Sequence, residues 1–243
     1  MYGPSNMSNI KKITAAPELG NMQQLIPEIV SKGIVYSIGH TEATYEDASA
    51  AVANGATMIT HLFNAMRPLH HRNPGVFGVL GIAESLPRPY FGIIADGIHL
   101  HPTSIKIAYA SHPDGFILVT DAMHLVGLPD GTYDWTNGRR LIKMGSHLVL
   151  EGSADKIAGS SITLIECVSN FLNWSGEGVG KALKAVTATP AAMLGLGGVK
   201  GCLDSDADAD LCIISEEVAP DGQKKLLVDQ VWKFGTKVFD RLE

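Results

Sequence analysis

Histidine and aspartate residues follow several apolar runs of this sequence. His40 follows one run, His61 lies near the end of the next and Asp121 follows a later one, while Asp96 and His99 follow the run between them. Imidazole is a good ligand for zinc and iron. A bound divalent ion lowers the pKa of its water from about 15.7 to roughly 7, which makes hydroxide available at neutral pH. A nearby carboxylate such as Asp121 can accept and return the proton, so this pattern indicates metal-assisted hydrolysis.

Each of these residues also has a structural interpretation. A single histidine on an apolar strand is more often a hydrogen-bonded core residue than a ligand. Two histidines at equivalent strand ends, with a carboxylate further along the chain, favour a metal site. Asp121 has the side chain of a helix N-cap, and for this residue both interpretations stay open.

Five short apolar runs precede and separate these polar residues. The runs are rich in Val, Ile, Phe and Thr without alternation, which is typical of parallel strands whose two faces are both covered by helices. Helical segments between the runs produce a repeated β-α order. Because ligands gather at the carboxyl ends of parallel strands, we expect the polar side chains to meet there. The predicted strands span 10–17, 34–39, 57–63, 90–95 and 116–120, and the predicted helices span 21–32, 42–54 and 103–110.

The second half of the chain changes character after Asp121. It alternates like a hairpin, then has two helical segments, and ends in a β-rich tail. We therefore expect two domains, one of repeated β-α units over 1–195 and a small β layer over 196–243. The predicted elements are a hairpin at 140–150, helices at 163–174 and 180–186, and strands at 209–215 and 230–239.

Composition excludes several classes of protein. The net charge of -6, from 19 Lys+Arg against 25 Asp+Glu, argues against nucleic-acid and membrane partners. No apolar run reaches the roughly 18 residues of a membrane-spanning helix. The N-terminus does not resemble a secretory signal, and the three cysteines have no CxxC spacing. We expect a cytoplasmic protein that acts on a small molecule.

A basic loop follows His61. It runs from Asn64 to Arg72 and contains a second arginine and two adjacent histidines. Arginine can hold a phosphate as a bidentate fork, and amides and imidazoles can bind sugar hydroxyls. A solvated surface loop explains the same composition equally well.

The sequence contains the strings SIGHT at 37–41, THLFNAM at 60–66, GIIADGIH at 92–99 and LVTDA at 118–122. Together these four strings resemble the N-acetylglucosamine-6-phosphate deacetylases, a family within the amidohydrolase superfamily. The similarity extends from about residue 16 to residue 211 and so covers most of the chain. The string at 60–66 is much less common in other amidohydrolases.

The resemblance implies a fold and a reaction. The fold is α/β, a partial TIM barrel in which the five runs correspond to strands four to eight, with part of a small β-sandwich at the C-terminus. His40 and His61 would bind one divalent metal, Zn2+ or Fe2+. Metal-bound hydroxide would deacetylate N-acetylglucosamine 6-phosphate to glucosamine 6-phosphate and acetate, with Asp121 as acid and base, in a homodimer. The implied substrate-binding residues are Asn64, Ala65, His71, Arg72 and His99.

The chain departs from the family pattern at one point. The family supplies a glutamate ligand and a carbonyl-polarising histidine from a segment that has no counterpart here. We considered Glu18, Glu42 and Glu151 as replacements and found none of them suitable. Two alternatives therefore stand beside deacetylation. The chain is a catalytically incomplete fragment that acts only with a complement or not at all, or it hydrolyses another N-acyl sugar or a cyclic amide.

Overall fold

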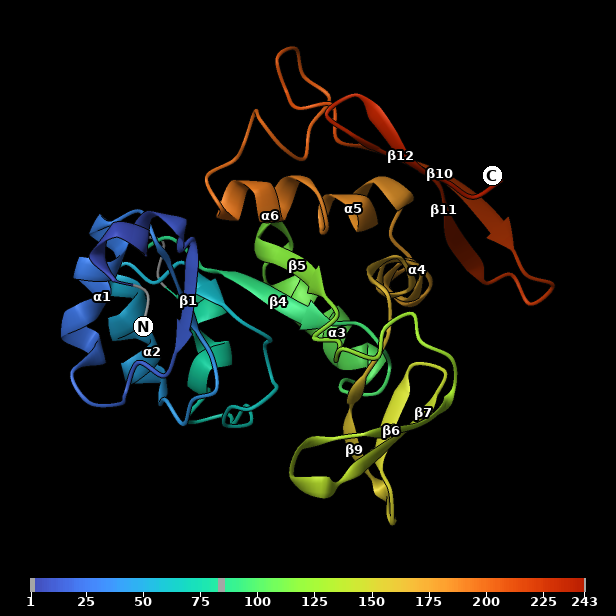
Figure 1. The fold of residues 1–243 in the computed structure, drawn as a ribbon. Coiled ribbons are helices and arrows are strands. Elements are labelled where there is room, and N and C mark those ends of the chain that lie inside the picture. The colour runs from blue at the N-terminus through green and yellow to red at the C-terminus, as the bar shows by residue number, and fades with distance from the viewer. Residues whose placement is uncertain (1–2, 83–85, 243) are drawn as a thin grey trace. The chain divides into compact units, whose positions relative to one another are not determined.

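The computed structural model describes residues 3–82 and 86–242 (Figure 1). These residues form two compact units. The first unit contains the chain up to Ile93, together with Ile107–Ile117 and Ala188–Gly197. The second contains Ile94–Lys106, Leu118–Thr187 and the chain from Gly198 onward. Several elements of the parallel sheet and its helices therefore contribute residues to both units.

A five-stranded sheet forms the core of the first unit, in the order β1-β2-β3-β4-β5. The first three neighbouring pairs are parallel. Both faces are covered, since adjacent residues that point to opposite faces, Ser37 and Ile38 on β2 and Ile93 and Ile94 on β4, are all completely buried, and this explains the absence of alternation. The predicted parallel sheet is confirmed, and each strand is shorter than its predicted run. The strands are β1 (Lys12–Ala15), β2 (Val35–Ile38), β3 (Met58–Ile59), β4 (Tyr90–Ile94) and β5 (Phe116–Val119).

Local sequence signals set the helices of this part of the chain. α2 begins with a capping box, in which Thr44 and Asp47 bond to each other's backbone N–H. Gly33 and Gly55 follow α1 and α2 with φ of +72° and +108°, values that glycine adopts without strain. The three predicted helices are confirmed, and α6 was not predicted. The helices are α1 (Met22–Ser31), α2 (Tyr45–Ala53), α3 (Pro102–Ser111) and α6 (Ala188–Met193), with 3-10 turns η1 (Pro4–Asn9), η2 (Gly75–Gly81) and η3 (Pro113–Gly115).

The second unit contains a four-stranded antiparallel sheet in the order β6-β7-β8-β9. The predicted hairpin is its centre, because β7 and β8 pair directly. Leu125, Leu141 and Leu148 form a small core against this sheet. The sheet comprises β6 (Gly131–Asp134), the 3-10 turn η4 (Thr136–Gly138), β7 (Arg140–Met144), β8 (His147–Leu150) and β9 (Ser153–Ser160).

Two helices and a three-stranded antiparallel sheet complete the second unit. The sheet has the order β10-β11-β12. Prediction of one strand over 230–239 was wrong, because Phe234 and Gly235 turn the chain with φ of +47° and +77° and divide the run into two strands. The elements are α4 (Leu164–Ser175), α5 (Val179–Lys184), β10 (Leu211–Val218), β11 (Lys224–Lys233) and β12 (Thr236–Asp240).

The larger architecture stays a prediction. A parallel sheet and a C-terminal antiparallel sheet are present, whereas barrel closure, a sandwich and the domain limits 1–195 and 196–243 are not tested by these elements. Within the described ranges, none of the helices is both long enough and apolar enough to cross a membrane.

Gly39 provides a test of how closely β2 and β3 approach before the first histidine. A Cβ at Gly39 would lie 2.7 Å from Thr60 Oγ1. We expect Gly39→Ala to lower the free energy of unfolding by about 1–3 kcal/mol through overpacking. Gly180→Ala in α5 is the control, because its Cβ meets nothing within 4 Å, and helix propensity predicts a gain of up to about 1 kcal/mol. Urea unfolding measures both, and a Gly39→Ala chain as stable as the control would contradict the close approach.

Candidate active site

The strand register brings His40 and His61 together. β2 and β3 pair in parallel with Ile38 opposite Ile59, and each histidine lies two residues beyond its strand's paired isoleucine. Their Nε2 atoms are 3.0 Å apart. The rings meet edge to face with centroids 4.7 Å apart. His61 is buried and His40 is exposed, so the pair lies at the surface of the first unit.

The donor atoms of this pair suit a divalent cation. An Nε2–Nε2 separation of 3.0 Å is close to the edge of a tetrahedral site, about 3.3 Å for Zn–N bonds of about 2.0 Å. His61 Nδ1 is buried without a hydrogen-bond partner in the described part of the chain. Two imidazole nitrogens that face each other can both direct lone pairs at one ion. The residues present therefore fit two positions of a metal site.

No third ligand joins the pair among residues 3–82 and 86–242, where no group of three His, Cys, Asp or Glu side chains is arranged to hold a metal. Both carboxylate oxygens of Glu18 accept hydrogen bonds from the loop that follows His40. Glu42 pairs with Arg67. In the second unit, Glu151 pairs with Arg140. Each candidate replacement glutamate thus has another partner.

The backbone around the histidines is strained and fixed. His40, Phe63 and Ala65 have φ of +50°, +75° and +49°. Non-glycine residues in this region cost about 1–3 kcal/mol each and persist only where the surroundings hold them. Thr41 N–H donates to Ala65 O at 3.0 Å, which ties the two strand-end loops together.

The basic loop after His61 is ordered but largely exposed. Asn64 donates to Leu62 O at 3.3 Å, and it is half-buried. The ring centroids of His70 and His71 are 4.2 Å apart, and Arg72 N–H donates to His70 Nδ1. Where the chain is described, no carboxylate pairs with the Arg72 guanidinium. His71 and Arg72 are therefore exposed donors, as either interpretation of the loop requires.

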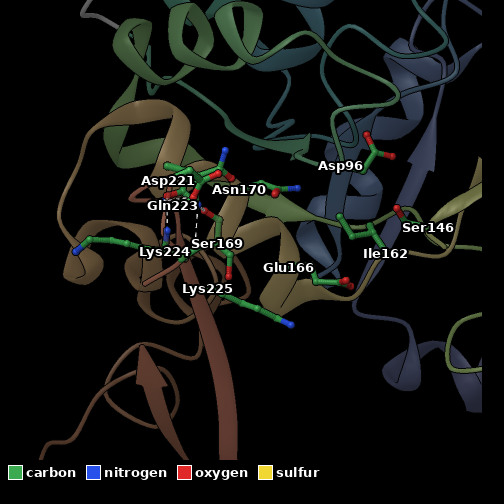
Figure 2. Close-up of a pocket in the computed structure, with 12 residues that line it drawn as sticks. Asp96, Ser146, Ile162, Glu166, Ser169, Asn170, Asp221, Gln223, Lys224 and Lys225 are labelled. Carbon is green, nitrogen blue, oxygen red and sulfur yellow. Dashed lines mark hydrogen bonds between the residues drawn. The ribbon is translucent and has the colours of Figure 1, made fainter. Parts of the chain in front are cut away.

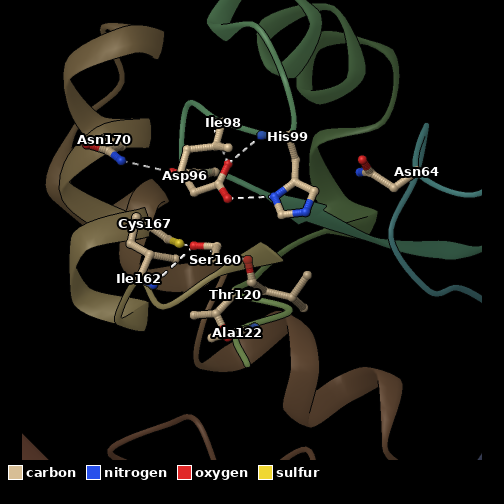
Figure 3. Close-up of polar contacts among 12 residues, drawn as sticks. Asn64, Asp96, Ile98, His99, Thr120, Ala122, Ser160, Ile162, Cys167 and Asn170 are labelled. Atoms are coloured by element: carbon tan, nitrogen blue, oxygen red, sulfur yellow. Dashed lines mark hydrogen bonds and ion pairs between the residues drawn. The ribbon is translucent and has the colours of Figure 1, made fainter. Parts of the chain in front are cut away.

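Asp96 and His99 form a tight pair in the second unit (Figure 3). Asp96 Oδ2 lies 2.6 Å from His99 Nδ1, and Oδ1 accepts the N–H groups of Ile98 and His99. Burial acts to raise the pKa of Asp96, but these hydrogen bonds outweigh burial and hold the pKa below its usual value. The bond to Asp96 raises the pKa of His99, with burial opposing it and the charges of Asp96 and Asp121 adding to the rise.

Asp121 begins the connection between β5 and the four-stranded sheet. It is exposed and has φ of +46°. The next residues do not form a helix, since Ala122 forms a bridge with Ser160 and Met123 N–H donates to Ser160 O. The interpretation of Asp121 as a helix N-cap is therefore wrong. Its charge adds to the raised pKa of His99, so the two groups interact electrostatically.

Helix α4 holds the strand ends that precede Asp96 and Asp121, and our sequence reasoning missed this role. Asn170 Nδ2 donates to Ala95 O at 2.9 Å, and the Cys167 thiol approaches Val119 O at 3.8 Å (Figure 3). Burial raises the pKa of Cys167 to about 12, so the thiol is a donor and not a nucleophile. The three-residue spacing of the cysteine and the asparagine on one helix face was the available signal.

A cavity of about 480 Å³ in the second unit has Asp96 among its lining residues (Figure 2). It is lined by residues of α4 and of the turn and strand around β11. Asn173 makes two hydrogen bonds with the Lys224 backbone, and Ser169 Oγ accepts Leu226 N–H. These polar groups join α4 to β11, so they stabilise the packing of the sheet and are not free for a ligand.

Curated relatives cover almost all of this chain. It is 42% identical over 236 residues to the N-acetylglucosamine-6-phosphate deacetylase of Danio rerio, a match that covers 96% of this chain and 57% of that protein. The Homo sapiens protein of the same name is 39% identical over 220 residues, covering 89% of this chain and 53% of the relative. The chain spans about half the length of the curated relatives it matches.

Solved structures agree with these relatives. The N-acetyl-D-glucosamine-6-phosphate deacetylase of Mycobacterium smegmatis has a TM-score of 0.81 at 31% identity, over 97% of this chain and 60% of that one. The N-acetylglucosamine-6-phosphate deacetylase of Thermotoga maritima has a TM-score of 0.79 at 28% identity, over 98% and 62%. An enamidase of the amidohydrolase superfamily, with a TM-score of 0.58 at 13% identity, shares the fold alone.

The family comparison extends over nearly the whole sequence. The model described as Amidohydrolase family matches residues 8–238. The expected resemblance is thereby confirmed, and the relatives that match are enzymes named as deacetylases. This chain belongs to the amidohydrolase family.

Proposed function

We propose that this chain contributes two metal ligands and the acid/base residue for hydrolysis of N-acetylglucosamine 6-phosphate to glucosamine 6-phosphate and acetate. The observation that carries the proposal is the pair of facing Nε2 atoms, 3.0 Å apart, at the ends of two adjacent parallel strands. The names of the relatives support this choice of substrate. The family match over residues 8–238 spans every residue that the proposal uses.

His40 and His61 would hold the divalent ion, Zn2+ or Fe2+. Such an ion supplies Lewis-acid chemistry, since it polarises a carbonyl and lowers the pKa of a coordinated water to about 7. The buried ring of His61 is fixed by its surroundings, whereas His40 depends on its strained loop for orientation. The two rings would therefore contribute differently to the affinity of the chain for the metal ion.

The exposed donors of the first unit would bind the sugar phosphate. The free guanidinium of Arg72 suits a bidentate contact with phosphate, and His71 is exposed beside it. The Asn64 amide and the Ala65 backbone, which has φ of +49°, would hold the sugar. In this arrangement the loop binds the phosphate, and the acetamide of the substrate lies at the histidine pair.

Asp121 would move the proton. Water attacks the acetyl carbon while Asp121 accepts a water proton, the C–N bond then breaks, and Asp121 returns that proton to the leaving nitrogen. This step gives the free amine and acetic acid, and transfer of the acid's proton to the amine then gives the ammonium form of the product and acetate, so atoms and charge balance. An exposed carboxylate on a fixed strand end suits both transfers.

His99 would donate from its Nε2 to the substrate. Its Nδ1 is held by Asp96 at 2.6 Å, which sets the ring orientation. The raised pKa keeps a larger fraction of this ring positively charged near neutral pH. A cationic donor suits a phosphorylated sugar, and this is the role we assign to it.

We extend the proposal to the context of the chain. The parallel sheet would form barrel strands four to eight and the β10–β12 sheet part of a small sandwich, in a homodimer. The three free cysteines fit a reducing, cytoplasmic compartment. The substrate is a small molecule, and the net charge of -6 disfavours nucleic acid.

A second candidate is a chain that is catalytically incomplete. It is favoured by the histidine pair, which lacks a third ligand within the described ranges. β1 and β5 are also the outer strands of their sheet in this part of the chain, and open edges favour pairing with a complement. This chain would then act only with another polypeptide or not at all.

An activity assay separates these two candidates. Under the proposal, the purified chain with added zinc releases acetate from N-acetylglucosamine 6-phosphate. Asp121→Asn should lower kcat by about 10²- to 10⁴-fold because proton transfer is lost, with zinc content unchanged. The fully exposed Asp134 provides the control variant Asp134→Asn. An inactive parent at saturating zinc would refute the proposal and support the incomplete chain.

Substrate preference tests a third candidate, hydrolysis of another N-acyl sugar or a cyclic amide. If Arg72 binds phosphate, Arg72→Ala should raise KM for the phosphorylated sugar by about 10- to 100-fold, because one charge-assisted contact is lost. KM for the unphosphorylated sugar should not change. Arg67→Ala is the control, since Arg67 pairs with Glu42. Equal kcat/KM for both sugars in the parent would favour the third candidate.

The Asp96–His99 pair makes stability depend on pH. The pKa of His99 is raised in the folded state, so the pair's stabilisation is complete below the ordinary value of 6.5 and is lost as pH rises through the folded pKa. Asp96→Asn should therefore destabilise the chain more at about pH 6 than at about pH 9. Urea unfolding at both pH values, with NMR titration of the His99 ring, measures this. Titration of His99 at or below 6.5 in the parent would contradict it.

A further inference from the structure

We infer that Glu18 is a positioning residue for His40, holding the two residues that follow this histidine so that its ring faces His61. The inference rests on the metal role proposed for His40 and goes beyond it. Glu18 lies three residues beyond the end of β1, the strand next to β2.

Both carboxylate oxygens of Glu18 accept hydrogen bonds from the loop that follows His40. The Thr41 hydroxyl donates to Oε2 at 2.5 Å, and the Glu42 N–H donates to Oε1 at 2.7 Å. Hydrogen bonds to a carboxylate are shorter and about twice as strong as neutral ones. Two such bonds to adjacent residues fix both the position and the rotation of the backbone that follows His40, which one bond cannot do.

Thr41 links Glu18 to the surrounding backbone through further hydrogen bonds. Its side chain is buried, with 4% exposed, and its Oγ1 also accepts the Ala43 N–H at 3.0 Å. Its own N–H donates to Ala65 O, in the loop after His61. Thr41 thus connects Glu18, the start of the segment leading to α2, and the second histidine's loop.

His40 needs such support because its backbone is unfavourable. Its φ of +50° lies in the region that β-carbon-bearing residues avoid. On its N-terminal side, Gly39 is packed against Thr60 and donates to Ala15 O at 3.4 Å. With Glu18 fixing the C-terminal side, the strained residue is held at both ends, as strained functional residues usually are.

Neighbouring Glu42 provides a contrast. Its side chain is 79% exposed and, among residues 3–82 and 86–242, pairs only with Arg67, at 3.2 Å, an arrangement that contributes little to stability. It carries the same charge two residues from His40. A long-range electrostatic effect on the histidines would therefore be common to both glutamates, whereas a positioning effect belongs to Glu18.

The experiment compares Glu18→Gln with the matched control Glu42→Gln. In the metal-free chain, the ¹⁵N signals of the His40 ring should shift in Glu18→Gln and stay in place in Glu42→Gln. Zinc affinity, measured by competition with a chromophoric chelator, should fall by about 10- to 100-fold in Glu18→Gln, the usual effect of losing a residue that orients a ligand. His40→Ala shows how far zinc affinity falls when the His40 ligand is lost completely. The control Glu42→Gln should keep the zinc affinity of the parent.

Two further variants test the same contact from its other side. Thr41→Val removes the hydroxyl and should show the same shift of the His40 ring signals as Glu18→Gln. Thr41→Ser keeps the hydroxyl and should therefore keep the parent's ring signals and zinc affinity. This pair decides the question if Glu18→Gln does not fold. The Tm of every variant is measured alongside, because a purely structural role would lower Tm without moving the His40 signals.

The inference is overturned if Glu18→Gln and Thr41→Val leave the His40 ring signals unchanged, or if zinc affinity falls no further than in Glu42→Gln. That result in a zinc-binding parent leaves the proposed function intact. A parent that does not bind zinc instead refutes the proposed metal role of the histidines. The ring signals of the metal-free chain then still decide whether Glu18 positions His40.

Discussion

The parallel register of β2 and β3 is the constraint on which the histidine pair depends. With Ile38 opposite Ile59, two further residues on each strand place His40 opposite His61. A shift by one residue would turn one imidazole to the other face of the sheet and separate the two nitrogens. The register is held by buried residues on both faces and, at the strand ends, by the Thr60 hydroxyl, which bonds to Ser37 Oγ at 2.7 Å.

Both units hold their strand ends with side chains from elsewhere in the chain. In the first unit a carboxylate after β1 binds the residues that follow His40. In the second, α4 supplies Asn170 and Cys167 to the carbonyls that precede the two aspartates. A functional residue at a strand end requires a fixed backbone. The backbone hydrogen bonds between neighbouring strands stop before that residue, so side chains from other elements must hold it in place.

Hydrophobic pattern predicted the parallel sheet because fully buried strands need continuous apolar runs. It failed at 230–239, where Phe234 takes a left-handed φ that no local composition rule assigns to phenylalanine. β6 and β9 were missed because they have few apolar residues and are stabilised by pairing with the central hairpin. α6 was missed because a six-residue helix carries little periodic signal.

The sequence alone determined the residue types at the strand ends, the order of the five parallel strands with the three helices between them, and the family, since these follow from local pattern and from strings of matching residues. Tertiary structure decided which of those residues meet. It brought His40 to His61, and it gave Glu18 its partners in the loop after His40. Hydrogen bonds between residues more than twenty positions apart depend on register and packing, which no local pattern contains.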